Sequence, residues 1–338
     1  MVILLISLFL SFFITYFATP QFIKFFKEIK TESTDVHKKK NPLIPMGGGI
    51  CALSGLLSGV FVFIALNTFF LKSQQDYTEL FSGIISIMII TFSGFFDDLA
   101  SKQVKYEGFT YKKGLKQWQK PLLTLPAVIP LMVINAGSTV INLPVFGFID
   151  LGLLYPLLII PVGIIGCANM VNLLGGFNGL EASMGAVYTL SLGLFALSIG
   201  ENLVALMLLC STAALIAFLI FNYFPAKIFP GDSLTYFLGV LVAVCAIMAD
   251  MEKFALITMS LFIIEGLLKA ASFIKLKKFA SSLGMLDDST GIIKSKYNKI
   301  YSLTHFAMGK KGATEQQIVI RLLIMQVFVA IIPWLLYA

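Results

Sequence analysis

The sequence has few charged residues: Asp, Glu, Lys and Arg together make up 13% of its 338 residues. Soluble domains carry about twice that share, because charged groups cover much of their surface. Hydrophobic residues supply 58% of the chain instead, and its mean hydropathy is +0.89. These values exclude a soluble globular protein and predict an integral membrane protein, with one all-α domain over residues 1–338.

Cysteine, histidine and arginine are also scarce. The four cysteines stand singly in apolar segments without CxxC spacing, so they indicate neither a disulfide framework nor a zinc site. The sequence has two histidines, His37 and His305, and a single arginine, Arg321. The motifs of P-loop nucleotide-binding proteins, protein kinases, α/β-hydrolases and zinc proteases are absent as well.

Long apolar runs predict ten membrane-spanning helices, at about 20 residues per crossing. The expected spans are Val2 to Phe25, Gly47 to Leu71, Phe81 to Asp97, Pro121 to Ala136, Leu151 to Leu174, Leu180 to Ile199, Leu203 to Phe224, Ser233 to Ala249, Phe254 to Ile274 and Gln316 to Tyr337. The fold class expected is therefore a polytopic all-α membrane protein with about ten transmembrane helices.

Lysines gather in every second connection between the predicted spans. The connections after the first, third, seventh and ninth spans hold nearly all of them, whereas the opposite face has only Lys72 and Lys253. By the positive-inside rule the lysine-rich face is cytoplasmic, and ten spans then place both termini outside. The basic isoelectric point of 9.1 thus reflects topology and anionic lipid headgroups rather than nucleic acid.

One stretch, NMVNLLGGFNGLE from Asn169 to Glu181, interrupts the apolar pattern. Amides and carboxylates are costly at membrane depth unless they line a hydrated cavity. Asn169 and Asn172 share a helix face, the paired glycines release the backbone, and Asn178 and Glu181 open the next helix. Two helix ends are therefore expected to converge on one polar site, with a plain interhelical turn as the alternative.

Carboxylates gather at span ends on the same lysine-rich face. Asp97 and Asp98 close the third span in GFFDDL, and Asp232 opens the eighth in FPGDSL. Each alone can be a helix cap, and Glu265 inside the ninth span can pair with Lys269. Together with the asparagine-rich break, however, these separated carboxylates on one face indicate a shared site.

This set of residues suits metal-assisted phosphoryl transfer. Carboxylate and amide oxygens without a Cys or His cluster are the ligands of a hard cation such as Mg²⁺, which bridges to substrate phosphates. Lysines beside such a site would bind phosphate. The sequence therefore predicts a phosphotransferase at the membrane surface that uses a lipid acceptor.

Three segments, GFFDDL, NMVNLLGGFNGLEA and NYFPAKIFPGDSLTYFLG, resemble the cytoplasmic motifs of the polyprenyl-phosphate N-acetylhexosamine-1-phosphate transferases. DVHKKKNPLIPMGGG, at Asp35 to Gly49, resembles the first cytoplasmic loop of that family. The Asn-Gly-Leu-Glu ending is most similar to the eukaryotic and archaeal dolichyl-phosphate GlcNAc-1-phosphate transferases, since bacterial members usually carry aspartates there. The resemblance covers nearly the whole chain and implies ten spans with both termini outside.

The resemblance implies a catalytic and metal-binding set. Asn172 and Asp232 would coordinate Mg²⁺, which Mn²⁺ can replace, and Asp97 and Asp98 would form an acidic pair beside the metal. Because adjacent residues on a helix point about 100° apart, the two aspartates should not share one role. Lys120, in WQKPLL, would contact phosphate.

The resemblance also implies residues that bind the substrate. Asn178 would contact uracil and Phe229 would stack on it, while Gly231 would let the backbone come close. The other substrate-binding candidates are Asn169, Glu181, Lys38, Lys277 and His305.

The loop after the ninth span departs from the family pattern. The dolichyl enzymes carry an Arg-His-Arg run there and bacterial members a histidine-rich run, whereas this chain has FIKLKKFASS. Lys275, Lys277 and Lys278 can replace the arginines only as point charges. His305 lies in a segment similar to the end of the bacterial motif. Because that loop selects the amino sugar in the family, the donor sugar stays open.

The resemblance implies Mg²⁺-dependent transfer of GlcNAc 1-phosphate, or another HexNAc 1-phosphate, from UDP-GlcNAc to a dolichyl or polyprenyl phosphate, with release of UMP. This reaction starts lipid-linked oligosaccharide synthesis for protein N-glycosylation. One alternative is the same reaction on undecaprenyl phosphate for a bacterial envelope polymer. Another is a transporter of an anionic solute, which would need polar groups near the midplane, where Glu265 is the best candidate.

Partners, location and mechanism complete the expectations. Membrane lipids and, in a homodimer, a second copy of the chain are further partners, and nucleic acid is not. The protein would lie in the cell membrane of an archaeon or bacterium, or in the ER membrane of a eukaryote, with a cytoplasmic active site. Direct attack by the lipid phosphate, which is already anionic, is favoured over a covalent intermediate on Asp98.

Overall fold

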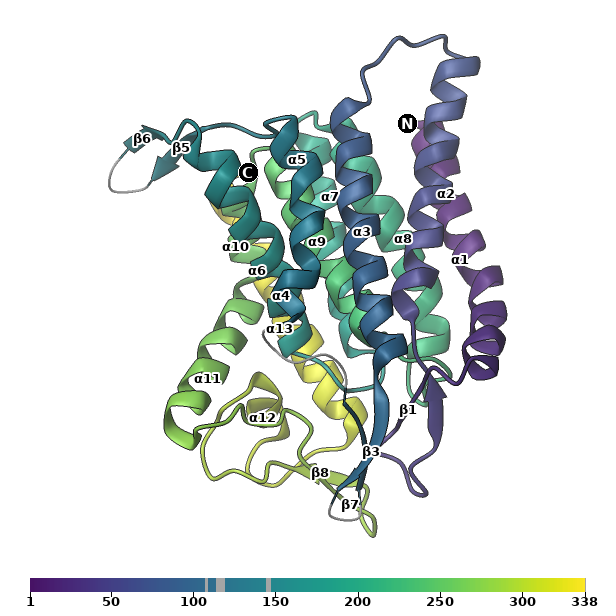
Figure 1. Cartoon of the computed structure of the whole chain (residues 1–338), viewed down its shortest axis with the longest axis vertical. Coiled ribbons are helices and arrows are strands. Elements are labelled where there is room, and N and C mark those ends of the chain that lie inside the picture. Colours follow the sequence, from purple (N-terminus) through teal and green to yellow (C-terminus); the bar gives the residue numbers. More distant parts are fainter. Residues whose placement is uncertain (107–108, 114–118, 144–146, 338) are drawn as a thin grey trace.

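Apolar runs fold into helices here because lipid offers no hydrogen bonds to the backbone, which must satisfy its own polar groups. The computed structural model describes residues 1–106, 109–113, 119–143 and 147–337 (Figure 1). Among them, eight helices are long and apolar enough to cross a membrane: α1 (Val2–Glu28), α2 (Gly48–Phe69), α3 (Thr78–Ala100), η2 with α6 (Tyr155–Ile159 and Ile160–Leu173), α7 (Leu180–Ser198), α8 (Asn202–Asn222), α9 (Gly231–Met248) and α13 (Glu315–Tyr337).

The other two expected spans are less regular. Helices α10 (Glu252–Thr258) and α11 (Ser260–Leu276) form a ninth apolar segment that is bent by 63°. The span expected from Pro121 to Ala136 is a shorter apolar helix, Leu122–Val133, made of α4 (Gln119–Thr124), η1 (Leu125–Val128) and α5 (Ile129–Val133). Its length of about 18 Å is well short of the roughly 30 Å hydrocarbon core. Prolines at the starts of η1 and α5 interrupt it, since proline has no N–H to donate.

Helix α9 is the centre of the bundle. Within the most apolar 18-residue window of α9, 89% is buried inside the protein. The corresponding share for α1 is 28%, and many large apolar side chains of α1 are exposed. An all-round apolar helix is typical of such a central position, because every face packs on protein. Helices α2, α3 and α6 surround α9, so its first turn marks the point where several helix ends meet.

Short antiparallel hairpins occupy connections in which the sequence analysis named no strands. Three lie at the lower end of the bundle in Figure 1: β1 (Glu32–Thr34) with β2 (Leu43–Pro45), β3 (Lys102–Tyr106) with β4 (Phe109–Lys113), and β7 (Met285–Asp287) with β8 (Ile292–Lys294). The short helix α12 (Leu303–Met308) lies there too. Both termini, and the hairpin of β5 (Val140–Leu143) with β6 (Gly147–Asp150), lie at the upper end. The chain is thus all-α in its spans, and the hairpins are confined to the connections.

Glycines allow other helices to approach α9 closely. A Cβ on Gly94 of α3 would lie 2.7 Å from the Asp232 carbonyl oxygen. A Cβ on Gly239, in the middle of α9, would overlap the backbone of Cys167 and Ala168 in α6. Real Cβ atoms do not come that close to backbone, so these glycines set the separation between the helices.

We expect Gly239→Ala to destabilise the protein by about 1–3 kcal/mol, because the added methyl group meets backbone that cannot rotate away. The matched control is Gly266→Ala in α11, where a Cβ meets no atom within 4 Å and alanine gains helix propensity. Thermal unfolding of the detergent-solubilised variants measures both. Equal melting temperatures for the two variants would contradict the close contact between α6 and α9.

Candidate active site

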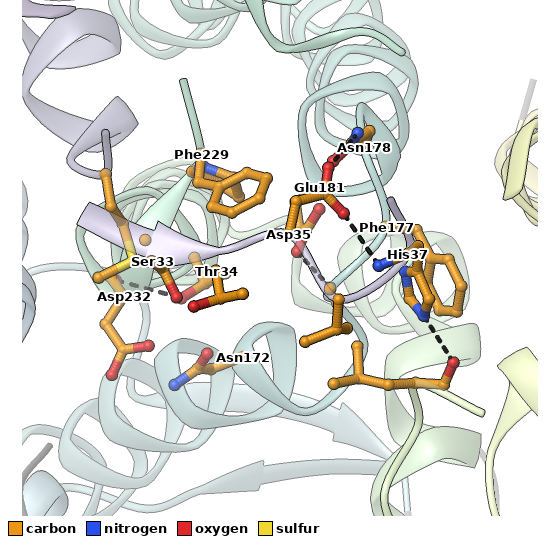
Figure 2. A pocket seen from close by; sticks show the side chains of 18 residues that line it. Ser33, Thr34, Asp35, His37, Asn172, Phe177, Asn178, Glu181, Phe229 and Asp232 are labelled. Atoms are coloured by element: carbon orange, nitrogen blue, oxygen red, sulfur yellow. Dashed lines mark hydrogen bonds between the residues drawn. The ribbon is translucent and has the colours of Figure 1, made fainter. Parts of the chain in front are cut away.

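A cavity of about 360 Å³ lies at the hairpin end of the bundle (Figure 2). Three polar segments that are far apart in the sequence line most of it: the β1–β2 connection, the break between α6 and α7, and the start of α9. Its lining residues are Ser33, Thr34, Asp35, Val36, His37, Met46, Asn172, Gly175, Gly176, Phe177, Asn178, Glu181, Phe229, Pro230, Gly231, Asp232, Thr235 and Leu283.

Backbone hydrogen bonds join the end of β2 and the start of α2 to the segment before α9. The Phe229 N–H donates to the Pro45 carbonyl at 2.7 Å, and the Phe229 carbonyl accepts from Gly47 and Gly48 at 3.3 and 3.2 Å. Met46 and Phe229 also form a parallel β-bridge. These bonds fix the backbone of Phe229, whose ring lines the cavity (Figure 2). Stacking of this ring on uracil stays a prediction.

The end of α3 meets the start of α9 through Asp98. Its carboxylate accepts hydrogen bonds from the backbone N–H groups of Asp232 (2.8 Å) and Ser233 (3.2 Å). The first N–H groups of a helix have no partner within the helix, and a carboxylate there also offsets the helix dipole. Asp232 was considered as a cap for this helix; it lies instead in the first turn, and Asp98 caps α9 from another helix.

Gly231 makes that contact feasible. Its φ of +69° lies in the left-handed region, and a Cβ there would overlap the Asp98 carboxylate. Glycine alone combines this backbone conformation with so close an approach at little cost. The close approach at Gly231 in this structure is to Asp98, and its expected approach to a substrate stays a prediction.

Lys120 joins Asp97 of α3 to Asp232 of α9. Its ammonium lies 2.8 Å from Asp97 Oδ2 and also bonds to Asp232 Oδ2. Asp97 and Asp98 thus make different contacts, as their 100° separation on the helix predicts. Asp98 itself lies against the backbone of Asp232, so the three aspartates and Lys120 together carry excess negative charge when all three carboxylates are ionised.

The break between α6 and α7 is closed by Glu181. Its Oε1 accepts from the Gly176 N–H at 2.8 Å, and its Oε2 is buried without a hydrogen-bond partner among the described residues. Asn172, at the end of α6, lines the cavity near Asp232, whereas Asn169 donates to the Ile165 carbonyl and does not line it. The convergence of two helix ends on one polar site is therefore observed for Asn172 and Glu181.

Asn178 bonds across the site rather than capping α7, whose N-cap residue is Gly179. Its side-chain amide donates to Asp35 Oδ2 at 3.1 Å, and its backbone N–H donates to Glu315 Oε1 at 2.8 Å. Lys38 pairs with Glu315 and lies 3.6 Å from Asp35 Oδ2. The break is thus tied both to the β1–β2 connection and to the first residue of α13.

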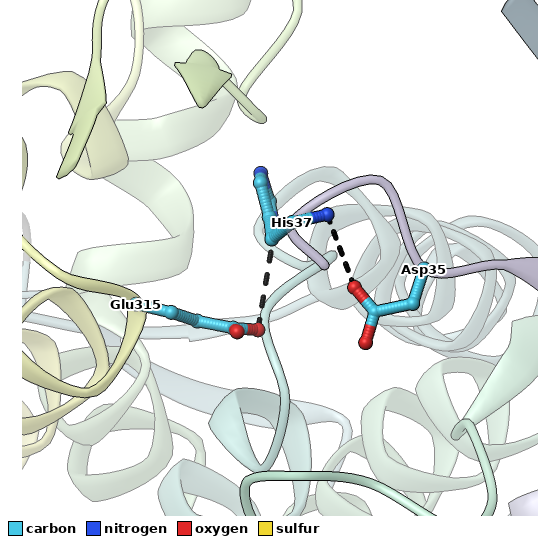
Figure 3. Close-up of side chains that lie close together, drawn as sticks. All are labelled: Asp35, His37 and Glu315. Atoms are coloured by element: carbon cyan, nitrogen blue, oxygen red, sulfur yellow. Dashed lines mark hydrogen bonds and ion pairs between the residues drawn. The ribbon is translucent and has the colours of Figure 1, made fainter. Parts of the chain in front are cut away.

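His37 lies beside these two carboxylates (Figure 3). One ligand atom from each of Asp35, His37 and Glu315 falls within 4.8 Å of the other two. Burial lowers the pKa of His37, although the Leu283 carbonyl, Glu315 and Asp35 act to raise it. The ring stacks on Phe177, and its Nε2 lies 2.8 Å from the Leu283 carbonyl. A neutral imidazole in that position donates through Nε2.

Other predicted residues lie outside the cavity. Lys277 is exposed at the C-cap of α11, and the buried ring of His305 bonds the Ser281 carbonyl at 2.9 Å within the connection before α13. The expected pair of Glu265 and Lys269 is present, at 3.4 Å. Glu265 also accepts from Leu303 N–H at 2.7 Å, so it holds the start of α12.

Sequence reasoning missed three residues that the structure brings to the site. Asp35 and His37 stand in the DVHKKK segment, which resembles the first cytoplasmic loop of the family but received no role beyond Lys38. Glu315 precedes the last expected span and lies 137 residues from its partner Asn178. A lone carboxylate at the start of a helix is ordinary, so the sequence held no strong signal for it.

Comparison with known proteins gives relatives along nearly the whole chain. A Saccharolobus solfataricus protein named UDP-N-acetylglucosamine–dolichyl-phosphate N-acetylglucosaminephosphotransferase is 31% identical over 98% of this chain and 96% of its own length. A Sulfolobus acidocaldarius protein of the same name is 31% identical over 90% of this chain and 87% of its own length. A phospho-N-acetylmuramoyl-pentapeptide-transferase of Halalkalibacterium halodurans is 34% identical over 78% of this chain and 81% of its own length.

Residues 80–250, which hold the Asp98 contact with α9, the α6–α7 break and the lysine–aspartate cluster, match glycosyl transferase family 4. With that match and the two archaeal relatives, the chain belongs to glycosyl transferase family 4, as a polytopic membrane enzyme of its GlcNAc-1-phosphotransferase branch.

Proposed function

We propose that this enzyme transfers GlcNAc 1-phosphate from UDP-GlcNAc to a dolichyl-type phosphate and releases UMP. One observation carries the proposal: a single cavity is lined by Asn178, by the ring of Phe229, and by Asp232 with Asn172 (Figure 2). The aromatic ring and the amide suit a nucleobase. The ammonium of Lys120, which pairs with Asp232, suits a pyrophosphate. A nucleotide sugar carries both groups in one molecule.

The relatives favour a dolichyl-type acceptor over undecaprenyl phosphate. The two archaeal relatives, named for dolichyl phosphate, match 98% and 90% of this chain, and the bacterial pentapeptide-transferase matches 78%. The product would then start a lipid-linked oligosaccharide for protein N-glycosylation. The same transfer to undecaprenyl phosphate is the second candidate, which the bacterial relative supports.

Mg²⁺ fits the residues at the Asp232 end of the cavity. Asp97 and Asp232 share the one ammonium of Lys120, Asp98 lies against the Asp232 backbone, and Asn172 adds an amide oxygen. Carboxylate and amide oxygens are the ligands of hard divalent cations. We propose that Asn172 and Asp232 hold the ion, which would neutralise charge on the pyrophosphate.

The bundle's two ends support a cytoplasmic active site. The cavity and three of the hairpins lie at one end, and both termini lie at the other (Figure 1). The connections at the cavity end carry most of the lysines. By the positive-inside rule we propose that this end is cytoplasmic and that both termini lie on the opposite side of the membrane.

Direct attack of the lipid phosphate on the donor is the mechanism we propose. A nucleophilic Asp98 would need a free oxygen aimed at the donor, but its two oxygens accept the N–H groups of Asp232 and Ser233. A phosphate monoester is already anionic near neutral pH and needs little activation. Lys120 and the metal site then stabilise the charge that develops on the phosphates.

The transporter alternative loses its main support. It needed a polar group inside the spans, with Glu265 as the candidate. That carboxylate bonds Ser302 Oγ at 2.8 Å and the Leu303 N–H at 2.7 Å, and it lies beside the Lys269 ammonium. Its contacts organise the connection before α13, which is a structural task.

We expect Asp232→Asn and Asn172→Ala each to lower kcat by about 10²-fold or more, because each removes a proposed metal ligand and its charge stabilisation. UMP release from UDP-GlcNAc with Mg²⁺ and a polyprenyl phosphate measures the effect, and EDTA should abolish it. Full activity of Asp232→Asn at saturating donor would contradict the assignment.

Lys120→Ala should raise the donor KM, lower kcat, or both, by about 10-fold or more in kcat/KM, because a half-buried positive charge beside the pyrophosphate is lost. Lys227→Ala is the matched control: this lysine is exposed in the segment before α9. Similar losses in both variants would mean that the lysines contribute only general surface charge.

Asp98→Asn should lower both stability and activity, since an amide presents one oxygen and one NH₂ to two N–H donors. With UDP-GlcNAc and no lipid acceptor, the wild-type enzyme should release no burst of UMP. Rapid-quench measurement of UMP tests this. A burst equal to the enzyme concentration that is lost in Asp98→Asn would establish a covalent intermediate instead.

A further inference from the structure

Glu315 connects three segments that meet beside the cavity. It is the first residue of α13, only 4% of its surface is exposed, and its two oxygens bond different partners. Oε1 accepts from the Asn178 backbone N–H at 2.8 Å, and Oε2 bonds the Lys38 ammonium. Both bonds leave the helix that carries Glu315, so they hold other segments in place.

The same contacts decide which way the Asn178 amide faces. Its NH₂ group donates to Asp35 Oδ2 at 3.1 Å, and a carboxylate can only accept, so the amide cannot turn its oxygen toward Asp35. Among the described residues none donates to Asn178 Oδ1, which remains as an acceptor on a residue lining the cavity. The Asp35 carboxylate itself accepts a hydrogen bond from the backbone N–H of His37 at 3.1 Å, and its Oδ2 lies 3.6 Å from the Lys38 ammonium.

A metal ion is the obvious competing occupant of this cluster, because Asp35, His37 and Glu315 have ligand atoms within 4.8 Å (Figure 3). Lys38 argues against it, since its ammonium already pairs with both carboxylates. All four carboxylate oxygens have partners as well. The second charge of a divalent ion would have to displace Lys38 and at least one N–H donor.

We propose that Glu315 is a positioning residue for nucleotide recognition: with Lys38 and Asp35 it holds Asn178 so that Oδ1 accepts an N–H group of the base. Asp35, Lys38, Asn178 and Glu315 are named here the Glu315 cluster. Its charged hydrogen bonds are shielded from water, and such bonds are stronger in the protein interior than on the surface. The inference rests on the proposed function, because it takes the ligand of Asn178 to be the base of a UDP-sugar.

The kinetic test compares Glu315→Ala and Glu315→Gln with Gln316→Ala, an exposed neighbour on the same helix. Glu315→Ala should raise the donor KM about 10-fold or more, with a smaller change in kcat, because the Asn178 N–H and Lys38 lose a shared buried acceptor. Glu315→Gln keeps an oxygen for the N–H and should restore part of the affinity. Gln316→Ala should match wild type.

Base selectivity separates positioning from a merely structural role. UMP should inhibit the wild-type enzyme more strongly than CMP, because N3 of uracil carries the N–H that Asn178 Oδ1 can accept and cytosine has none there. Glu315→Ala should reduce the ratio of the two inhibition constants toward one. An unchanged ratio, or a loss confined to kcat, would overturn the proposal.

Hydrogen exchange of the ligand-free enzyme tests the cluster independently of catalysis. In Glu315→Ala, peptides covering residues 172–181 and 33–46 should exchange faster than in wild type, while peptides from α9 stay protected. If the exchange changes in this way but the wild-type protein releases no UMP from UDP-GlcNAc, the Glu315 cluster is upheld and the proposed donor is refuted. Unchanged exchange in both peptides would overturn the inference, whatever the activity.

Discussion

The contact between Asp98 and the first turn of α9 is the interaction on which the site depends. The start of a helix exposes N–H groups and a partial positive charge, and where α9 packs against α3 a partner from the protein has to satisfy them. Asp98 meets this need from α3, and Gly94 and Gly231 allow the two backbones to come close enough. The position of Asp232, and with it the salt bridge to Lys120, follows from that cap.

Two groups of buried carboxylates lie near the cavity, and they differ in charge balance. In the Glu315 cluster, two carboxylates share one lysine and three N–H donors, so each oxygen is satisfied. Around Lys120, the carboxylates of Asp97 and Asp232 share one ammonium, and Asp98 beside them accepts two backbone N–H groups, so the three aspartates and Lys120 together carry excess negative charge when all three are ionised. A satisfied network makes a rigid structural element, whereas excess negative charge can attract a cation. The same residue types therefore suit two tasks within one site.

Much of the fold was predictable because the membrane restricts the backbone so strongly. Apolar runs gave the long helices, and the alternation of connections brought Asp97, Asn172 and Asp232 together. Residues 122–133 form a helix too short for a regular span; the apolar run predicted a crossing there, while Pro126 and Pro130, which interrupt it, were visible in the sequence and received no weight. Motifs located the cavity, since they mark segments that must leave the apolar pattern.

The finer contacts needed three-dimensional information. Asp232 follows a glycine and has the pattern of an N-cap, but a residue 134 positions earlier performs that task. Glu315 looks like an ordinary first-turn carboxylate until Asn178 is placed against it. His305 was expected from the family motif to bind substrate, but both of its ring nitrogens make hydrogen bonds within the connection before α13. Long-range pairings of this kind leave no periodic trace in a sequence.

The backbone ladder between residues 45–48 and Phe229 affects how a ligand is received. The hydrogen bonds of this ladder join segments of the chain to one another, so the conformational entropy of these segments is lost when the chain folds. An arriving molecule then forfeits mainly its own freedom of motion, and little of its interaction energy goes to ordering the protein. Recognition at this wall is thus closer to a lock and key than to induced fit, with encounter rather than loop rearrangement setting the rate of association.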